Sequence, residues 1–342
     1  MNFCFSNRVK ARKILIVTGI YPPQIGGPAQ YAKNLAEALT EAGDKVEVRT
    51  YGWEKRLPSG WSHFFLFLKL LPAVARAEAV IALDTFSVAV PAYYATRFFR
   101  RKFIIRIGGD FLWESYTERT EERVLLKNFY PDTPNNWTAK EKQIFKLTKQ
   151  ALHAASTIVF TTNWQRGIWA EPYGLDLAKT TIIENYYGPK ESSFESESKT
   201  FVGGARQLVW KNLDNLARNF FTTKLRDGSL QLDLENAPYE EFIEKIRQAY
   251  AVILVSLGDV SPNMILDAIR LGKPFILTRE TGLYDRLRGV GIFVDPESDK
   301  EIIEAIMTLA DPNEYDRWRA KVNQFTFTHT WQQIAEEFRK LL

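Results

Sequence analysis

Short apolar runs alternate with longer amphipathic segments along the chain from Lys13 onward. Short apolar runs bounded by turn residues are typical of buried strands, and segments with apolar positions three and four residues apart are typical of helices. A regular alternation of the two predicts an α/β protein with parallel sheets. The strands predicted in the first half of the chain are residues 14–18, 46–50, 79–83, 103–107, 157–161 and 181–183.

Helical spacing and capping signals predict where several helices begin and end. Tyr31, Leu35, Ala38 and Leu39 share one face of a predicted helix, and Gly43 is a suitable residue to end it. Ser or Thr followed three residues later by Glu or Gln is the signature of a capping box. This signature occurs at Thr138–Glu141, Ser298–Glu301 and Thr330–Gln333. The last box precedes a terminal helix whose apolar face includes Trp331, Ile334 and Phe338.

A polar stretch, residues 187–200, divides the chain into two halves. It is rich in serine and glutamate and has few apolar residues, which predicts an exposed linker. The alternation then restarts, with strands at 230–234, 252–257, 274–277 and 292–294 and helices from Tyr239 and Pro262. We expect a first domain at 1–188, a linker at 189–200, a second domain at 201–327 and a terminal helix within 328–342.

Composition narrows the class of protein. A chain of 342 residues exceeds the usual size of one core, which agrees with two domains. The single cysteine, Cys4, excludes an internal disulfide framework, and with only three histidines it argues against a zinc site. The net charge of +4 permits an anionic partner, but no nucleic-acid reader motif accompanies it.

The sequence also bears on location. Residues 1–12 lack the apolar core of a signal peptide, and the apolar stretch 61–75 is too short and too interrupted to span a membrane. We therefore expect a cytoplasmic protein that makes at most a weak peripheral contact with the inner face of the membrane.

The first motif with chemical content is the turn after the first strand, which contains Gly26 and Gly27. Paired glycines between a strand and a helix let backbone N–H groups approach a ligand, and the helix N-terminus adds partial positive charge. Neither a Walker pattern nor GxGxxG is present, which argues against a P-loop enzyme and an ordinary NAD site. The alternative is a glycine turn needed only for tight strand–helix passage.

The second motif is a pair of cations, Arg206 and Lys211, just after the linker. A guanidinium and an ammonium at this spacing can bind a diphosphate together. The alternative, which is more common for an Arg/Lys pair, is that both side chains are simply solvated. In the diphosphate-binding role Lys211 would be an exposed cation of the cleft, which adds little to stability.

The third motif, residues 258–274, is the most specific. Ser261 is a natural N-cap and Pro262 a natural first residue, so a helix is expected to begin directly after a buried strand. Its N-terminus would point at the carboxyl end of the sheet, where open α/β folds bind ligands. The N–H groups of Asn263 and Met264 could then hold phosphate oxygens.

Two carboxylates accompany this third motif. Asp259 precedes the predicted helix, and Asp267 lies just under two turns into it, within reach of sugar hydroxyls. The alternative is that Asp267 is only a polar residue on the exposed side of the helix.

Together these motifs resemble glycosyltransferase family 4, whose members are retaining enzymes of the GT-B fold, and the resemblance covers nearly the whole chain. Arg206 and Lys211 coincide with the family's phosphate-binding pair, and Asp259 and Asp267 with the two carboxylates of its E-x7-E motif. Glu184-Asn185 lies where the family ends its first domain. The fold implied is two Rossmann-like domains facing each other across a cleft, with a C-terminal helix crossing back to the first domain.

The resemblance also implies roles. Gly26 and Gly27 would line the donor pyrophosphate and the acceptor side of the cleft. Ser261, Asn263 and Met264, at the start of the predicted helix, are the further candidates for donor binding. Arg206 and Lys211 would neutralise the departing nucleoside diphosphate, Asp259 would contact the transferred sugar, and Asp267 would contact the ribose. The donor would be a nucleotide sugar and the acceptor a glycan or a lipid-linked molecule. No cofactor and no metal are expected, because catalysis would rest on positioning and charge stabilisation.

The chain departs from the family pattern at three places. Both family glutamates are aspartates, one methylene shorter. The family's His-Gly is replaced by Gly108-Gly109-Asp110, so either Asp110 or backbone groups take the acceptor-side role, with Glu114 as a further candidate. The second domain is trimmed between residues 220 and 238. A nucleotide-sugar 2-epimerase and a binding protein without turnover therefore stay as alternative functions.

Aromatic and basic residues in the first domain allow two interpretations. Trp61, Phe64, Phe65, Phe67, Leu68 and Leu71, together with the basic cluster 97–102, either dock on an anionic membrane or pack into the core with the arginines facing water. Core packing is favoured, because many helices here must bury one face.

Overall fold

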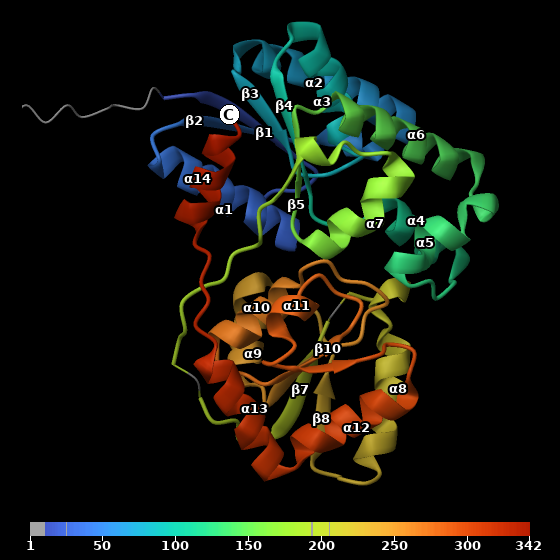
Figure 1. Cartoon of the computed structure of the whole chain (residues 1–342), viewed down its shortest axis with the longest axis vertical. Helices are drawn as coiled ribbons and strands as arrows, with labels where there is room; N and C mark the ends of the chain where they lie inside the picture. Colours follow the sequence, from blue (N-terminus) through green and yellow to red (C-terminus); the bar gives the residue numbers. More distant parts are fainter. Residues whose placement is uncertain (1–10, 25, 193, 205) are drawn as a thin grey trace, which may run out of the picture.

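The computed structural model describes residues 11–24, 26–192, 194–204 and 206–342. Cys4 and most of the N-terminal segment tested above for a signal peptide lie outside these ranges. Within them, two parallel sheets lie one above the other along the long axis of the molecule (Figure 1). No helix in these ranges is long and apolar enough to cross a bilayer.

The first sheet has six described strands in the order β2-β1-β3-β4-β5-β6, all parallel. These strands are β1 (Lys13–Thr18), β2 (Lys45–Thr50), β3 (Ala79–Ala82), β4 (Lys102–Ile107), β5 (Thr157–Phe160) and β6 (Thr180–Ile182). Each predicted strand is confirmed to within one or two residues.

The second sheet has five described strands in the order β11-β10-β9-β7-β8, again parallel. They are β7 (Lys199–Gly203), β8 (Leu230–Asp233), β9 (Ala251–Leu254), β10 (Phe275–Thr278) and β11 (Ile292–Val294). The chain passes from one sheet to the other between Ile182 and Lys199. The predicted linker, 189–200, covers most of this passage, but its last two residues belong to β7, a strand that the sequence analysis did not predict.

Helices cover both faces of each sheet. In the first half they are α1 (Gly27–Glu41), α2 (Ser59–Arg76), α3 (Ala89–Phe99), α4 (Phe111–Thr120), α5 (Leu126–Asp132), α6 (Ala139–Ala154) and α7 (Asn163–Tyr173), with 3-10 turns η1 (Trp53–Arg56), η2 (Pro134–Asn136) and η3 (Leu177–Lys179). In the second half they are η4 (Val209–Lys211), α8 (Leu213–Lys224), α9 (Tyr239–Gln248), α10 (Asn263–Arg270), α11 (Tyr284–Leu287), α12 (Asp299–Ala310), α13 (Pro312–Gln324) and α14 (Trp331–Lys340).

The alternation of side chains along the strands explains these layers. In β1, Leu15 and Val17 join the core beneath α2, α3 and α6, whereas Ile14 and Ile16 join the core beneath α1 and α14. Successive strand residues point to opposite faces, so a continuous apolar run marks a strand buried on both sides.

The predicted helix ends are mostly confirmed. Thr138 and Thr330 form complete capping boxes. Ser298 caps α12, but the Glu301 carboxylate accepts from the Asp295 N–H instead of completing the box. Gly43 has φ 93 and follows the end of α1, a conformation that glycine adopts without strain.

The chain returns from the second domain to the first at its end. Tyr187 and His329 exchange backbone hydrogen bonds of 3.0 Å, so the two connecting segments run side by side. α14 then packs on α1, with the Trp331 ring 5.2 Å from the Tyr31 ring and stacked on Tyr186. The predicted crossing helix is confirmed. The predicted linker begins differently, because Tyr187 is buried instead of exposed.

One core prediction is wrong in part. Trp61, Phe64 and Leu68 of α2 are exposed, because Leu66 and Leu70 on the opposite face of the same helix already fill the contact with the sheet. Phe65, Phe67 and Leu71 are partly buried.

Candidate active site

The two domains meet where the strands of both sheets end. The Trp113 ring of α4 lies 5.5 Å from the Trp210 ring of η4, and the Leu126 N–H donates to the Leu257 carbonyl at 3.2 Å. Lys127 pairs with Glu280 across the same interface at 2.5 Å. At Gly258 a β-carbon would lie 2.5 Å from Leu126 Cβ, so only glycine allows this approach. The domains are therefore in close contact on this side.

Two helix N-termini face each other elsewhere in the interface. α1 begins at Gly27, and a β-carbon on Gly27 would lie 3.0 Å from Asn263 Nδ2, at the first residue of α10. Gly26, just before α1, has φ 146, which other residues rarely adopt. Because both helices point their partial positive charge at this place, it favours a negatively charged ligand.

The start of α10 differs by one residue from the prediction. Pro262 is the N-cap, the helix begins at Asn263, and no side chain caps it. Ser261 is therefore not the N-cap; its carbonyl oxygen instead accepts a hydrogen bond from Asn185. The N–H groups of Asn263 and Met264 are in the first turn, where α-helices have no internal acceptor.

A relay of side chains from the first domain fixes the first residue of α10. Arg106 donates to Asn185 Oδ1 at 2.7 Å, and Asn185 Nδ2 donates to Ser261 O and to Asn263 Oδ1, both at 3.2 Å. Since Asn263 Oδ1 is the acceptor, Asn263 Nδ2 is left as a donor on the side of Gly27.

Arg106 is a buried cation at the end of β4. It is 6% exposed, its guanidinium lies 3.8 Å from the centre of the Tyr31 ring, and burial lowers its pKa. No carboxylate pairs with it among the described residues, and its Nε has no partner there. A buried guanidinium without an anion is costly, so this arrangement also favours a bound anion.

The predicted cation pair lies beside the predicted carboxylate. Lys211 Nζ is 2.6 Å from Asp259 Oδ2, and the Asp259 N–H donates to the Glu280 carbonyl. Lys211 also lies 4.3 Å from the centre of the Trp210 ring, and Arg206 lies 6.0 Å from it. The expectation of a solvated Lys211 is wrong, because its side chain is 13% exposed and held by an ion pair.

Glu114 of α4 faces this group from the first domain. Burial raises the pKa of its carboxyl to about 7, and the charges that act on it are Arg206 and Lys211, which lower the pKa, and Asp110 and Asp259, which raise it. Within the described part of the chain, no hydrogen bond or ion pair engages this carboxyl group. It is therefore free to contact a ligand held at the interface.

Asp110, predicted on the acceptor side, has both carboxylate oxygens engaged inside the first domain. Its side chain is 2% exposed and caps α4 by accepting from the Trp113 N–H at 3.0 Å, while its other oxygen accepts from Tyr130 at 2.7 Å. Burial raises the pKa of Asp110 to about 6. Because both oxygens are engaged inside the domain, Asp110 holds the start of the helix that carries Glu114.

Asp267 lies one turn into α10 and is held by an arginine. Its carboxylate accepts from Arg270 at 3.1 Å, and Arg270 also pairs with Glu191 of the linker. Burial raises the pKa of Asp267 to about 6, and burial, with a smaller contribution from the charge of Asp267, raises the pKa of Tyr239 to about 12. Asp267, Arg270 and Tyr239 thus form one cluster at the linker side of α10.

The structure therefore brings Arg206, Lys211, Asp259 and Glu114 together, and places Gly27 against Asn263. Sequence reasoning predicted no role for Arg106, and it identified Asn185 only as a residue near the end of the first domain. An arginine inside the otherwise apolar run Phe103–Ile107 was the available signal, because a charged residue in a buried strand needs a partner.

No protein-family model matches the sequence, and no curated protein matches it significantly. Solved structures do resemble it. Sucrose-phosphate synthase from Thermosynechococcus elongatus superposes with a TM-score of 0.68 at 12% identity, over 96% of this chain and 98% of that one. HepE of Anabaena, in complex with UDP and glucose, gives a TM-score of 0.66 at 13% identity, over 96% and 98%.

A third similar structure is a protein of Listeria monocytogenes described as a UDP-N-acetylglucosamine 2-epimerase, with a TM-score of 0.63 at 13% identity over 96% and 95%. At these identities the likeness shows the fold, which is GT-B: two parallel α/β domains joined by crossing segments.

Proposed function

We propose that the protein is a glycosyltransferase that moves a hexosyl group from a nucleoside-diphosphate donor to a glycan or lipid-linked acceptor, with retention at the anomeric carbon. One observation carries the proposal: the N-termini of α1 and α10 meet at the domain interface, with Arg206 and Lys211 in the same interface. HepE, which shares the fold, is described in complex with UDP and glucose.

The donor diphosphate would occupy the place between these helices. The first N–H groups of α10 and the Asn263 amide would donate to phosphate oxygens, and Arg206 would add a guanidinium fork. Arg106 would add a further positive charge near the diphosphate, and through Asn185 it would hold Asn263 in place. Because the domains are in close contact, the donor would enter when they separate.

Lys211 would change partner during the reaction. In the structure it neutralises Asp259, and a bound diphosphate would compete for the same ammonium group. Asp259 would then be released to accept a hydrogen bond from a hydroxyl of the transferred sugar. The leaving diphosphate gains charge as the sugar departs, and Lys211 would stabilise that charge most in the transition state. The reaction would need no metal.

Glu114 would act on the acceptor side. A carboxyl with a pKa of about 7 is divided between its two protonation states at neutral pH, which suits a group that accepts a proton from an attacking hydroxyl. It lies on the first domain, opposite the predicted donor groups. The leaving phosphate would share this task in a retaining reaction without a protein nucleophile. We place the reaction in the cytoplasm, at the inner face of the membrane when the acceptor is lipid-linked.

A panel of UDP- and GDP-sugars tests the proposal. The protein is incubated with each donor, with and without glycan or polyprenyl-linked acceptors, and nucleoside diphosphate release is measured. We expect release from one donor to rise when its acceptor is added, with the product anomer matching the donor. Release from none of the donors with any acceptor, despite nucleotide binding, would contradict transfer and support a binding protein.

A 2-epimerase is the second candidate, because a protein described as one shares the fold. Such an enzyme would convert the donor into its 2-epimer without an acceptor. Analysis of the sugar in the same incubations separates the two activities, since a transferase leaves C2 unchanged.

A further inference from the structure

Two neighbouring helices of the first domain present apolar side chains to solvent. α2 and α3 pack together on one face of the first sheet, away from the second domain (Figure 1). Trp61, Phe64 and Leu68 recur on the outer side of α2, and all three are exposed. On α3, Tyr94 and Phe98 lie one turn apart, and Phe98 is 74% exposed. Adjacent exposed apolar stripes of this kind mark an interaction surface.

Basic residues follow directly at the end of α3. Arg97, Arg100, Arg101 and Lys102 lie within six residues, and no salt bridge in the described part of the chain includes any of them. Other arginines do pair, as Arg119 does with Glu141.

Positive charge is also concentrated in the first half of the chain. Residues 1–188 contain 25 Lys and Arg against 17 Asp and Glu, whereas residues 189–342 contain 20 against 24. The first domain is therefore the electropositive one, and the basic residues of 97–102 belong to it.

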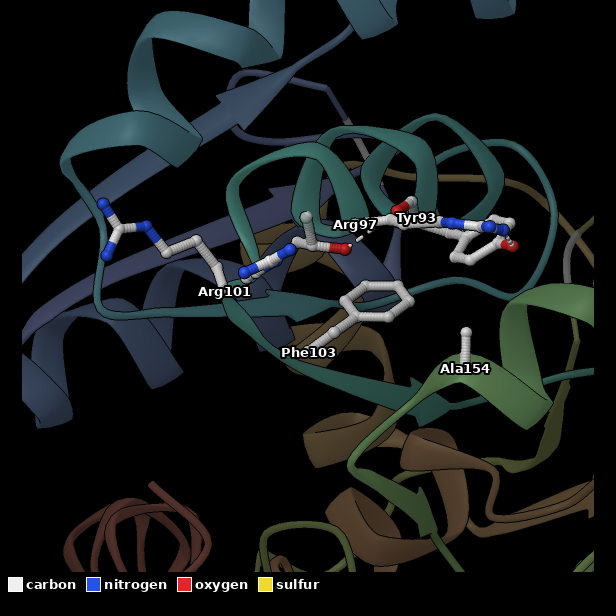
Figure 2. Close-up of a pocket in the computed structure, with 7 residues that line it drawn as sticks. Tyr93, Arg97, Arg101, Phe103 and Ala154 are labelled. Atoms are coloured by element: carbon white, nitrogen blue, oxygen red, sulfur yellow. Dashed lines mark hydrogen bonds between the residues drawn. The ribbon is translucent and has the colours of Figure 1, made fainter.

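A hollow of about 360 Å³ lies among these basic residues. Thr96, Arg97, Arg100 and Arg101 line it from α3 and the turn that follows, with Phe103 of β4 and Ala154 of α6 opposite. Figure 2 shows Arg97 beside Tyr93, whose hydroxyl accepts from its guanidinium at 3.0 Å, whereas Arg101 extends to the other side and donates to the Ala75 carbonyl. Arg101 Nε is buried without a partner. The hollow is cationic and has no acidic side chain in its lining.

We propose that this hollow, the α3–α6 hollow, binds the headgroup phosphate of an anionic phospholipid, while the apolar stripes of α2 and α3 enter the surface of the bilayer. Arg97 and Arg100 would donate to the phosphate oxygens, because guanidinium groups form paired hydrogen bonds with phosphate. Tryptophan and phenylalanine are the residues that settle at the boundary of headgroups and acyl chains.

Exposed apolar side chains on the same helix pair point to a lipid as the source of the phosphate. Phe98 lies next to Arg97 of the hollow, whereas Trp61 and Phe64 lie at the other end of the pair, where α2 begins. A soluble phosphate ester would use the arginines but would leave Trp61, Phe64 and Phe98 exposed to water. A bilayer satisfies both features at once, with phosphate at the hollow and acyl chains against the stripe. The inference stands independently of the proposed transfer reaction, because no residue of the domain interface contributes to it.

Vesicle flotation with the full chain tests the proposal. Vesicles of phosphatidylcholine are compared with vesicles that also contain phosphatidylglycerol, at low ionic strength, and glycerol 3-phosphate serves as the soluble probe in a thermal-shift assay. The double variant Arg97→Gln, Arg100→Asn removes two charges; asparagine is chosen at position 100 because Arg100 has φ 50. Phe98→Ala tests the apolar stripe. The matched controls are Arg226→Gln and Phe221→Ala on the second domain, both exposed in the parent.

We expect binding to the anionic vesicles only. Each arginine at an anionic surface contributes about a fivefold gain in partitioning, so the double variant should bind roughly 25-fold more weakly. Phe98→Ala should also weaken binding, and both controls should bind like the parent. UDP binding by the double variant should be unchanged, which separates a failure here from a failure of the proposed function.

Two kinds of result would overturn the proposal. The first is equal binding of the parent and the double variant to anionic vesicles, or equal binding of the parent to neutral vesicles. The second is saturable binding of glycerol 3-phosphate that the double variant loses while the parent ignores vesicles, which would assign the hollow to a soluble phosphate.

Discussion

Replacing Glu114 by glutamine tests the electrostatics of the interface directly. The carboxyl has its pKa raised from 4.5 to about 7, mainly by burial. A raised pKa in the folded state means that, between pH 4.5 and 7, the folded protein binds more protons than the unfolded chain. The free energy of unfolding is therefore highest below pH 4.5, where the carboxyl is protonated in both states. It falls as the pH rises through 7, because the folded protein must then hold the charged carboxylate in a buried place.

The pKa change sets the size of this effect. A fully desolvated carboxyl with this pKa would cost about 3 kcal/mol above pH 8, and a carboxyl that keeps part of its contact with water, as Glu114 does, about 1–2 kcal/mol. Glu114→Gln removes the charge without changing the shape. At pH 8 the variant should therefore be more stable than the parent by about 1–2 kcal/mol, and at pH 4.5 the two should be equal.

Urea unfolding of parent and variant from pH 4.5 to 8.5 measures this difference through the transition midpoints. Glu240→Gln, at an exposed position on α9, is the matched control and should give the same profile as the parent. Asp110 and Asp267 contribute in the same direction near pH 6, but both variants retain them. Parallel profiles for the parent and Glu114→Gln would refute the placement of Glu114 in a desolvated site.

Three further predictions follow from the same contacts. Lys211→Ala should abolish turnover and destabilise the fold by about 1–3 kcal/mol by leaving Asp259 without a partner; the double variant with Asp259→Ala should recover the stability but not the activity, and single and double variants that unfold alike would contradict the pair. Asp267→Asn should lower the free energy of unfolding by about 1–3 kcal/mol in urea, because it removes the charge that Arg270 pairs with; unchanged nucleotide affinity in calorimetry would remove Asp267 from the predicted ribose contact. Gly26→Ala should cost about 1–3 kcal/mol because of its φ of 146, whereas Gly60→Ala, where a β-carbon meets nothing within 4 Å, should be neutral or slightly stabilising; equal effects in thermal unfolding would argue against strain at Gly26.

The sequence was sufficient for the fold because the relevant signals are local. Strands buried on both faces give continuous apolar runs, and capping residues such as Thr138 and Thr330 act within one turn of their helix. The same holds for Arg206, Lys211 and Asp259, because a strand followed by a loop places its loop residues at the carboxyl edge of the sheet.

Contacts between residues far apart in the sequence could not be predicted from these local signals. Asn185 acquires its role only because residues 185 and 263 meet across the domain interface. Asp110 looked like a free carboxylate, but Tyr130, twenty residues later, occupies its second oxygen. The exposure of Trp61 depended on which face of α2 meets the sheet, and an almost wholly apolar helix does not specify that face.

The central claim is that a nucleoside diphosphate binds between the N-termini of α1 and α10. A crystal structure of the protein with UDP or GDP tests it most directly. The account predicts phosphate oxygens within hydrogen-bond distance of the Asn263 N–H and of Arg206 and Lys211, with the Lys211–Asp259 contact lengthened. A diphosphate bound elsewhere, with that ion pair intact and Asn263 in contact only with protein, would contradict it.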